Sequence, residues 1–287
     1  MNTIAIVGAT GNIGSRIAGA LADAGRNVRA IARNPKIADG RLERHAADLK
    51  DPGCAIAALE GVTAVYLTPP MGGPDPKGDE RTVCSNVIEA AAKQGVEHVV
   101  MHTAVRANWG NTGAGILDNL APVEQQLAES GVGYTILRPA WFLQNLWAAR
   151  DYLQQGVVSL PWPADMSWAA TDINDIATAA LRFLDEGPAD RGYDVHVPGG
   201  ITGQQIADAA TRVLGHDVAY QQADATTRQY VDGFPTSEPH KDLYAELFDY
   251  FTSTTYAGEP EDITDDLDGF EIHGVEHFLR SELFATQ

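Results

Sequence analysis

Short apolar runs alternate with amphipathic stretches over the first half of this chain. The first run, residues 4–7, is rich in β-branched side chains and ends at a glycine-rich turn. Behind it, apolar residues recur at spacings of three and four, which is typical of a helix with one buried face. Because this order of strand and helix repeats, we predict a parallel sheet covered by helices on both faces. The predicted strands are residues 4–7, 27–33, 45–49, 63–68, 96–103 and 133–139, and the predicted helices are 13–24, 51–59, 79–93 and 118–130.

From Trp141 onward the pattern changes, because aromatic residues and prolines interrupt the regular alternation. Four of the five tryptophans of the chain fall between residues 141 and 168. Thr171-Asp172 predicts the start of a helix, and residues 193–197 predict an edge or seventh strand. We expect a mobile flap in the loop 71–78, which is rich in proline and glycine, and a solvated acidic surface at 259–268. The further predicted elements are helices at 173–184, 202–215 and 242–251 and a short strand at 218–220.

The turn after the first predicted strand carries a glycine at every third position. Gly8 can take a turn with positive φ, and Gly11 lets the backbone approach a pyrophosphate. Gly14 lets the following helix pack closely on the sheet, so that its N-terminal N–H groups point at the phosphates. Any tight turn between a strand and a helix favours glycine. Here the strand and the helix supply the context that dinucleotide binding requires.

The end of the second predicted strand carries Arg33, which lies 19 residues after Gly14. A fold that binds NAD tends to place an acidic residue near this position, where it binds the ribose 2′-hydroxyl. A guanidinium instead suits a 2′-phosphate and can lie across the adenine. The other interpretation is a solvent-exposed arginine at the end of a strand. We predict NADP(H) as the cofactor.

Two further strand ends offer polar side chains to the same edge of the sheet. Asp48 can accept a hydrogen bond from the adenine amino group while Leu49 covers the ring, and it equally suits a cap of the next turn. Thr103 ends the fifth strand near the expected nicotinamide, where its hydroxyl can orient a substrate carbonyl. It is the one candidate catalytic residue, and a hydroxyl bonded to backbone is the alternative. His102 points to the opposite face by strand alternation, so we expect it to be packed.

The tryptophan-rich segment has two interpretations. It can form a hydrophobic core, or it can form an aromatic wall over the nicotinamide that suits a flat, apolar substrate. The expected lining of such a substrate pocket is Trp109, Trp141, Phe142, Asn145 and Trp162.

Charge and cysteine content limit the classes of partner and the kinds of site that we expect. The chain has 39 acidic and 20 basic residues and a net charge of −19, which repels nucleic acid and anionic membranes. Cys54 and Cys84 have no metal-like spacing, so neither a metal site nor a disulfide framework is expected. No apolar run approaches the roughly 18–20 residues that span a bilayer. The first residues enter a strand directly, without a signal-peptide pattern, and we expect a cytoplasmic location.

Taken together, these pieces resemble the NmrA-like group of atypical short-chain dehydrogenases/reductases. The resemblance rests on residues 8–14, 28–33, 48–49, 124–131 and 134–146. It implies an α/β fold in which a Rossmann-type doubly wound parallel sheet binds NADP(H) over residues 1–150, rejoined by about 171–200. A smaller C-terminal α+β lobe, mainly 151–287, would bind substrate. The implied cofactor contacts are Gly8, Thr10, Gly11, Asn12, Ile13, Arg33, Thr68, Pro69, Thr103, Pro139 and Phe142.

The chain departs from the usual pattern of short-chain dehydrogenases at one point. It contains no Tyr-x-x-x-Lys, whose tyrosine acts as the acid. Residues 118–123 also lack the Lys or His that active members of the group often keep there. Two functions follow from the resemblance. One is an NADPH-dependent reductase of a flat, largely apolar carbonyl, quinone or aromatic natural product. The other is a non-catalytic NADP(H)-sensing regulator that binds a protein partner. A homodimer is left open.

Overall fold

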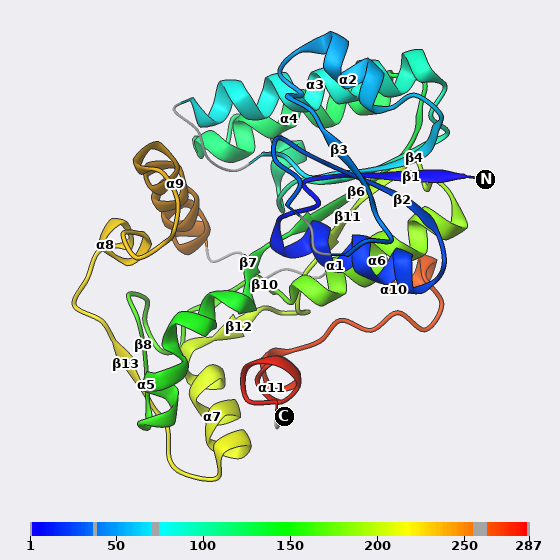
Figure 1. The fold of residues 1–287 in the computed structure, drawn as a ribbon. Coiled ribbons are helices and arrows are strands. Elements are labelled where there is room, and N and C mark those ends of the chain that lie inside the picture. The colour runs from blue at the N-terminus through cyan, green and yellow to red at the C-terminus, as the bar shows by residue number, and fades with distance from the viewer. Residues whose placement is uncertain (1, 37–38, 71–74, 255–262, 286–287) are drawn as a thin grey trace. The chain divides into compact units, whose positions relative to one another are not determined.

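The computed structural model describes residues 2–36, 39–70, 75–254 and 263–285. The chain forms two compact units (Figure 1). Unit 1 comprises Met1–Arg138 and Ile176–Tyr193, and unit 2 comprises Pro139–Asp175 and Asp194–Gln287. The chain therefore leaves unit 1 after residue 138 and returns to it once. The division into a cofactor domain and a substrate lobe near residue 150 stays a prediction, and parts of the predicted flap and of the predicted acidic surface lie outside the described residues.

Unit 1 is built on a seven-stranded sheet of order β11-β6-β5-β4-β1-β2-β3. All neighbouring strands from β3 to β6 pair in parallel. The chain runs outward from β1 through β2 and β3, then crosses back to β4 on the other side of β1. Ligands bind such sheets where the order reverses, at the carboxyl ends of the strands. The strands are β1 (Thr3–Val7), β2 (Asn27–Ala32), β3 (Glu43–Ala46), β4 (Val62–Leu67), β5 (His98–His102), β6 (Gly133–Pro139) and β11 (Arg191–Val195).

Helices cover both faces of this sheet. In Figure 1, α2, α3 and α4 lie on one face and α1 and α6 on the other. Buried apolar side chains of α2, α3 and α4 share one core cluster with β1, β4 and β5, which explains why these strands read as nearly continuous apolar runs. The predicted doubly wound α/β class is confirmed. The elements are α1 (Asn12–Asp23), α2 (Pro52–Ala58), α3 (Pro76–Gln94), η1 (Ala107–Trp109), α4 (Gly115–Glu129) and α6 (Ile173–Glu186).

The strands of unit 2 are short. Its described residues form three two-stranded sheets, of which β7–β10 and β8–β13 are parallel and β9–β12 is antiparallel. The strands are β7 (Trp141–Phe142), β8 (Val157–Leu160), β9 (Ser167–Trp168), β10 (Ala170–Thr171), β12 (Ile201–Thr202) and β13 (Ala219–Gln222). The helical elements are η2 (Leu143–Ala149), α5 (Arg150–Gln154), α7 (Gly203–Leu214), α8 (Thr227–Val231), α9 (Glu238–Thr254), α10 (Ile263–Asp266), α11 (Val275–Phe278) and η3 (Leu279–Leu283).

Two helices of unit 1 begin earlier than the sequence predicts. Helix α3 starts at Pro76, because the Asp75 carboxylate accepts the N–H of Gly78 and proline suits a first helical position. Helix α4 starts at Gly115. Asp118, the predicted first residue, lies within the helix and uses its carboxylate to hold the preceding loop. Among the described residues, no helix is both long and apolar enough to cross a membrane.

One ionisable side chain of α3, Glu80, is half-buried against α4. The Glu80 carboxylate accepts a hydrogen bond of 2.6 Å from the Asn119 amide, which also donates to the carbonyl of Lys77. Burial raises the pKa of Glu80 to about 7. The protonated form therefore dominates in the folded protein over a pH range where an exposed glutamate is ionised.

We expect Glu80→Gln to remove a pH-dependent part of the stability. The folded state binds this proton more tightly than the unfolded state, whose glutamate has a pKa near 4.5. The contribution of Glu80 to the free energy of unfolding is thus highest below pH 4.5 and falls as the pH rises to 7. Relative to Glu80→Gln, wild type should lose on the order of 2–3 kcal/mol across this range. Urea unfolding at both ends of the range measures this change.

The matched control is Glu89→Gln, since Glu89 is exposed on the same helix. Its unfolding free energy should follow that of wild type at every pH. Parallel pH profiles for wild type and Glu80→Gln would contradict the expectation.

Candidate functional site

The turn after β1 has the geometry that the sequence predicts for Gly8. This residue has a φ of +82°, a backbone conformation that residues other than glycine rarely adopt. Its N–H donates to the carbonyl of Ile31 at the end of β2, and its own carbonyl accepts from Gly11. The turn is thereby tied to the neighbouring strand and to the start of α1.

Gly14 allows α1 to lie directly on this turn. A Cβ added at Gly14 would come within 2.8 Å of the carbonyl carbon of Gly8 and closer still to its oxygen. No side chain fits in that space without moving the backbone of one element. The close helix packing expected of the third glycine is therefore present, and it fixes where the N-terminus of α1 points.

The N-terminus of α1 is open to an anion. Gly11 is the N-cap residue, and in the described structure no side chain caps the helix and no acidic residue occupies its first turn. Thr10, Gly11 and Asn12 are exposed, whereas the Ile13 side chain is buried in the core. Unpaired N–H groups and the helix dipole favour a phosphate at such an end. These residues fit the pyrophosphate of a dinucleotide.

Arg33 and Asp48 end the neighbouring strands β2 and β3. Arg33 is exposed, and it forms no ion pair with any residue that the structure describes. Asp48 accepts the N–H of Lys50 through its side chain and that of Asp51 through its carbonyl. It thus makes the turn before α2, the second of its two predicted roles. Leu49 is buried within the core cluster.

Thr68 and Pro69 follow β4, beside the glycine turn. A Cβ added at Gly8 would lie 3.1 Å from the Cβ of Thr68, so the two strand ends are in close contact. The hydroxyl oxygen of Thr68 is buried, and it has no hydrogen-bond partner among the described residues. Pro69 is buried as well. An orphaned buried hydroxyl at the carboxyl edge of the sheet fits a polar ligand there.

Thr103 belongs to a buried polar network at the end of β5. Its hydroxyl donates to Glu124 of α4 over 2.6 Å. The guanidinium of Arg138, on β6, donates to the same carboxylate over 2.8 to 3.2 Å. A Cβ at Gly192 of β11 would come within 2.5 Å of this guanidinium, so glycine makes room for it. The network joins the end of β5, α4 and β6 around one carboxylate.

This network limits the chemistry of Thr103. A hydroxyl can donate one hydrogen bond, and here that bond goes to the carboxylate of Glu124. The oxygen of Thr103 is left as an acceptor. Sequence reasoning missed the pairing of Glu124 with Arg138, although one signal was available. Both charged residues interrupt apolar patterns that otherwise predict burial.

His102 has the packed role that strand alternation predicts. Its Nδ1 lies 2.8 Å from the hydroxyl of Tyr66. Burial lowers the pKa of His102 to about 4 and raises that of Tyr66. Both groups are therefore neutral at physiological pH. The raised pKa makes the Tyr66 hydroxyl a weaker acid, and neutral His102 lacks the imidazolium proton, so neither is a ready proton donor.

The predicted substrate-pocket residues fall into both units. Trp109 belongs to η1 of unit 1 and is 61% exposed. Trp141 and Trp162 of unit 2 are buried and pack edge to face at 6.3 Å, and Trp168 joins them. Within unit 2 this cluster forms a hydrophobic core, which is one of the two interpretations of the tryptophan-rich segment. Phe142 and Asn145 are half-buried, and Pro139 is buried. Their contacts with cofactor or substrate stay predictions.

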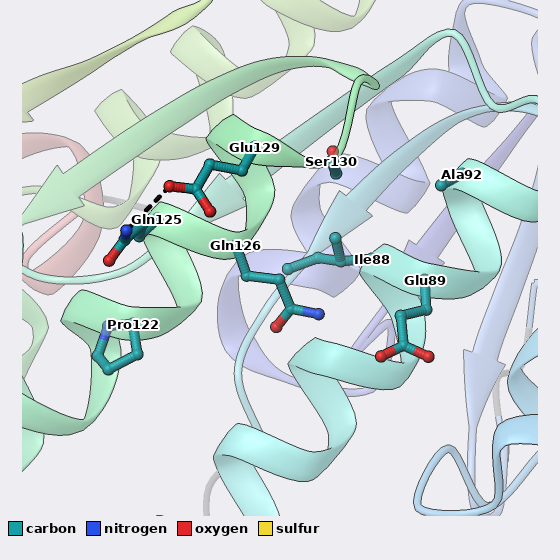
Figure 2. Close-up of a pocket in the computed structure, with 8 residues that line it drawn as sticks. All are labelled: Ile88, Glu89, Ala92, Pro122, Gln125, Gln126, Glu129 and Ser130. Carbon is teal, nitrogen blue, oxygen red and sulfur yellow. Dashed lines mark hydrogen bonds between the residues drawn. The ribbon is translucent and has the colours of Figure 1, made fainter.

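A shallow groove lies between α3 and α4 (Figure 2). It is formed mainly by the later turns of both helices, which return the chain to the amino ends of the next strands. The glycine turn, Thr68 and Thr103 all stand at the carboxyl ends. The groove is therefore separate from the candidate site. It is lined by Ile88, Glu89, Ala92, Pro122, Gln125, Gln126, Glu129 and Ser130.

Known proteins share this organisation. Residues 8–184 match a family profile described as NAD(P)H-binding. The chain is 30% identical to the NAD(P)H azoreductase of Xenophilus azovorans over 253 residues, which are 85% of this chain and 86% of that protein. It is 29% identical to quinone oxidoreductase 2 of Escherichia coli over 76% of this chain and 77% of that protein.

The fold similarity extends over nearly the whole chain. The crystal structure of the NADPH-dependent quinone oxidoreductase of Escherichia coli in complex with NADPH aligns with a TM-score of 0.77. The two are 26% identical, and the alignment covers 98% of this chain and 99% of the other. The profile match alone spans more than half of the sequence. The protein belongs to the NAD(P)H-binding family of atypical short-chain dehydrogenases/reductases and is an NAD(P)H-dependent oxidoreductase, as its motifs predict.

Proposed function

We propose that this protein is an NADPH-dependent reductase of a flat, largely apolar quinone, carbonyl or related aromatic substrate. The observation that carries the proposal is the open turn at Gly8–Asn12 on the uncapped N-terminus of α1. The similarity to an azoreductase and a quinone oxidoreductase over more than three quarters of the chain supports the substrate class.

Different residues at the carboxyl edge would bind different parts of the cofactor. Backbone N–H groups at Asn12 and Ile13 would bind the pyrophosphate, with Thr10 and Gly11 beside it. Arg33 would pair with the 2′-phosphate, and Asp48 and Leu49 would border the adenine. Thr68 and Pro69 would line the path toward Thr103. When bound, the cofactor supplies a hydride from its nicotinamide.

Thr103 has a positioning role in this proposal. Because its proton is donated to Glu124, its oxygen can accept a hydrogen bond from the carboxamide of the nicotinamide. The proton needed for reduction then comes from water. A quinone suits this arrangement, because one hydride converts it to a hydroquinone anion, a weak base that takes one proton from solvent. Such a substrate does not need the missing Tyr-x-x-x-Lys pair.

Phe142 and Asn145 of unit 2 are the proposed contacts of a flat aromatic substrate, since both are half-buried. Trp141, Trp162 and Trp168 pack against one another in the core of that unit.

A second candidate function is a non-catalytic NADP(H) sensor that binds a protein partner. The observation that favours it is the closed network of Thr103, Glu124 and Arg138, which leaves no free acid in that network. Capture of a partner from lysate only in the presence of NADP(H) would support the sensor. In this proposal a second copy of the chain, which would form a homodimer, is the alternative to a different protein as the partner.

Turnover separates the two functions. We expect purified protein to oxidise NADPH, followed by its absorbance, when a panel of quinones and azo dyes is supplied. Binding of NADPH is measured in parallel by calorimetry. Tight NADPH binding without turnover on any member of the panel would contradict the reductase and leave the sensor.

Arg33→Asp tests the choice of cofactor. We expect the affinity for NADPH to fall at least tenfold, about 1.4 kcal/mol, because a carboxylate would face the 2′-phosphate. The affinity for NADH should change less. Arg44→Asp is the matched control, since Arg44 is an exposed arginine of the adjacent β3. Equal losses for NADPH and NADH would show that Arg33 does not read the 2′-phosphate.

Gly14→Ala tests the packing that orients α1. Its methyl group would meet the backbone of Gly8, so we expect NADPH affinity to fall at least tenfold, about 1.4 kcal/mol. Gly19→Ala is the control on the same helix, because a Cβ there meets nothing within 4 Å. This variant should keep its affinity and gain roughly 0.5–1 kcal/mol of stability. Calorimetric titration that finds the same affinity in both variants would refute the role of Gly14.

A further inference from the structure

The last described segment of the chain, residues 263–285, is anchored within unit 2 by apolar side chains. Phe278, Leu279 and Leu283 are buried, and α11 and η3 pack against α7 (Figure 1). Two polar side chains of this C-terminal segment, His273 and Glu282, also bind residues at the start of α6 that belong to the same unit. Neither side chain has a role in the site described above.

Glu282 binds a side-chain amide that is buried and fully engaged. The oxygen of the Gln144 amide accepts the N–H of Ile173 over 3.1 Å. Its nitrogen donates to Asp172 over 2.8 Å and to Glu282 over 3.2 Å. An amide nitrogen has two N–H donors, so each carboxylate accepts one of them. Because Gln144 is only 7% exposed, these bonds fix the orientation of its amide.

The carboxylate of Glu282 connects two separate stretches of backbone. One oxygen accepts from Gln144 of η2, and the other accepts from the amide of Asn174 over 2.7 Å. His273 makes a second attachment, since its N–H and its ring nitrogen lie 2.8 and 2.6 Å from the oxygens of Asp175. Removal of the Glu282 carboxylate would leave the second N–H of Gln144 buried without this acceptor, which is costly.

The proposed substrate contacts lie on either side of Gln144. Phe142 is the N-cap of η2, and Asn145 follows three residues later. Residues three apart in a 3₁₀-helix lie on the same side of it. Leu143, Gln144 and Leu146 are buried, whereas Phe142 and Asn145 are half-buried. A rotation of η2 about its axis would move Phe142 and Asn145 together, and the hydrogen bonds of Gln144 oppose this rotation.

We propose that Glu282 and Gln144 are positioning residues of the substrate site. Through them the C-terminal segment holds η2, and η2 in turn holds Phe142 and Asn145 in the orientation that a flat aromatic ring requires. Neither positioning residue touches the substrate. This inference rests on the proposed reductase function, and it names the part of the chain that sets the affinity for the substrate.

The experiment measures how Glu282→Ala binds a naphthoquinone when NADP⁺ is bound, because the oxidised cofactor has no hydride to transfer. Calorimetry should show a Kd about tenfold above that of wild type. With NADPH, the KM for the quinone should rise to a similar extent while kcat changes less than about twofold. The affinity for NADPH should also change less than about twofold, since the residues proposed for its pyrophosphate and 2′-phosphate lie in unit 1.

A second variant relates the effect to the hydrogen bonds of the carboxylate. Glu282→Gln retains one acceptor oxygen for two donors, so its quinone Kd should lie between those of wild type and Glu282→Ala. Thermal unfolding checks that each variant is folded. If Glu282→Ala does not fold, the Kd of Glu282→Gln decides the test.

Two matched controls come from the same C-terminal segment. Glu271 is an exposed glutamate, and Glu271→Ala should leave the quinone Kd unchanged. Val275 is buried in α11, so Val275→Ala should lower the unfolding temperature and also leave the Kd unchanged. A general loss of stability in the segment is thereby distinguished from the loss of the Glu282 hydrogen bonds.

Quinone binding and NADPH turnover separate the two hypotheses. The same quinone Kd in wild type and Glu282→Ala, or no binding of the quinone to wild type, would overturn the positioning role. If wild type binds the quinone more tightly than Glu282→Ala but does not reduce it, the positioning role is supported and the reductase function is not. If both proteins reduce the quinone with the same KM, the reductase function is retained and the positioning role is refuted.

Discussion

The contact between α1 and the turn after β1 is the constraint on which the candidate cofactor site depends. Gly14 brings the helix backbone onto Gly8, and the positive φ of Gly8 turns the chain at that point. The helix N-terminus is then aimed at the carboxyl edge of the sheet without a side chain to cap it. Its N–H groups remain available to phosphate because the packing holds them in place.

A second constraint fixes the other end of this edge. Glu124 is buried with Arg138 and Thr103, and breaking one partner of such a buried pair typically costs about 3–5 kcal/mol. The pair therefore fixes the positions of β5, β6 and α4 relative to one another. It also decides which way the proton of Thr103 points. The same interaction that stabilises unit 1 thus leaves Thr103 as an acceptor and removes it as an acid.

The proposed reductase function rests on these two constraints. The candidate cofactor edge runs from the glycine turn toward Thr103, which follows β5. A substrate that needs no protein acid suits a site whose hydroxyl already donates to Glu124.

Local patterns in the sequence were sufficient to determine the alternation of strands and helices and the roles of Gly8 and Gly14. Apolar periodicity and backbone freedom are properties of neighbouring residues. The role of Thr103, which the sequence left open, depends on a residue distant along the chain. Its hydroxyl donates to Glu124, which lies 21 residues further on, and Arg138 donates to the same carboxylate. Only the tertiary structure could show this, because the direction of a hydrogen bond depends on which partners the fold brings together.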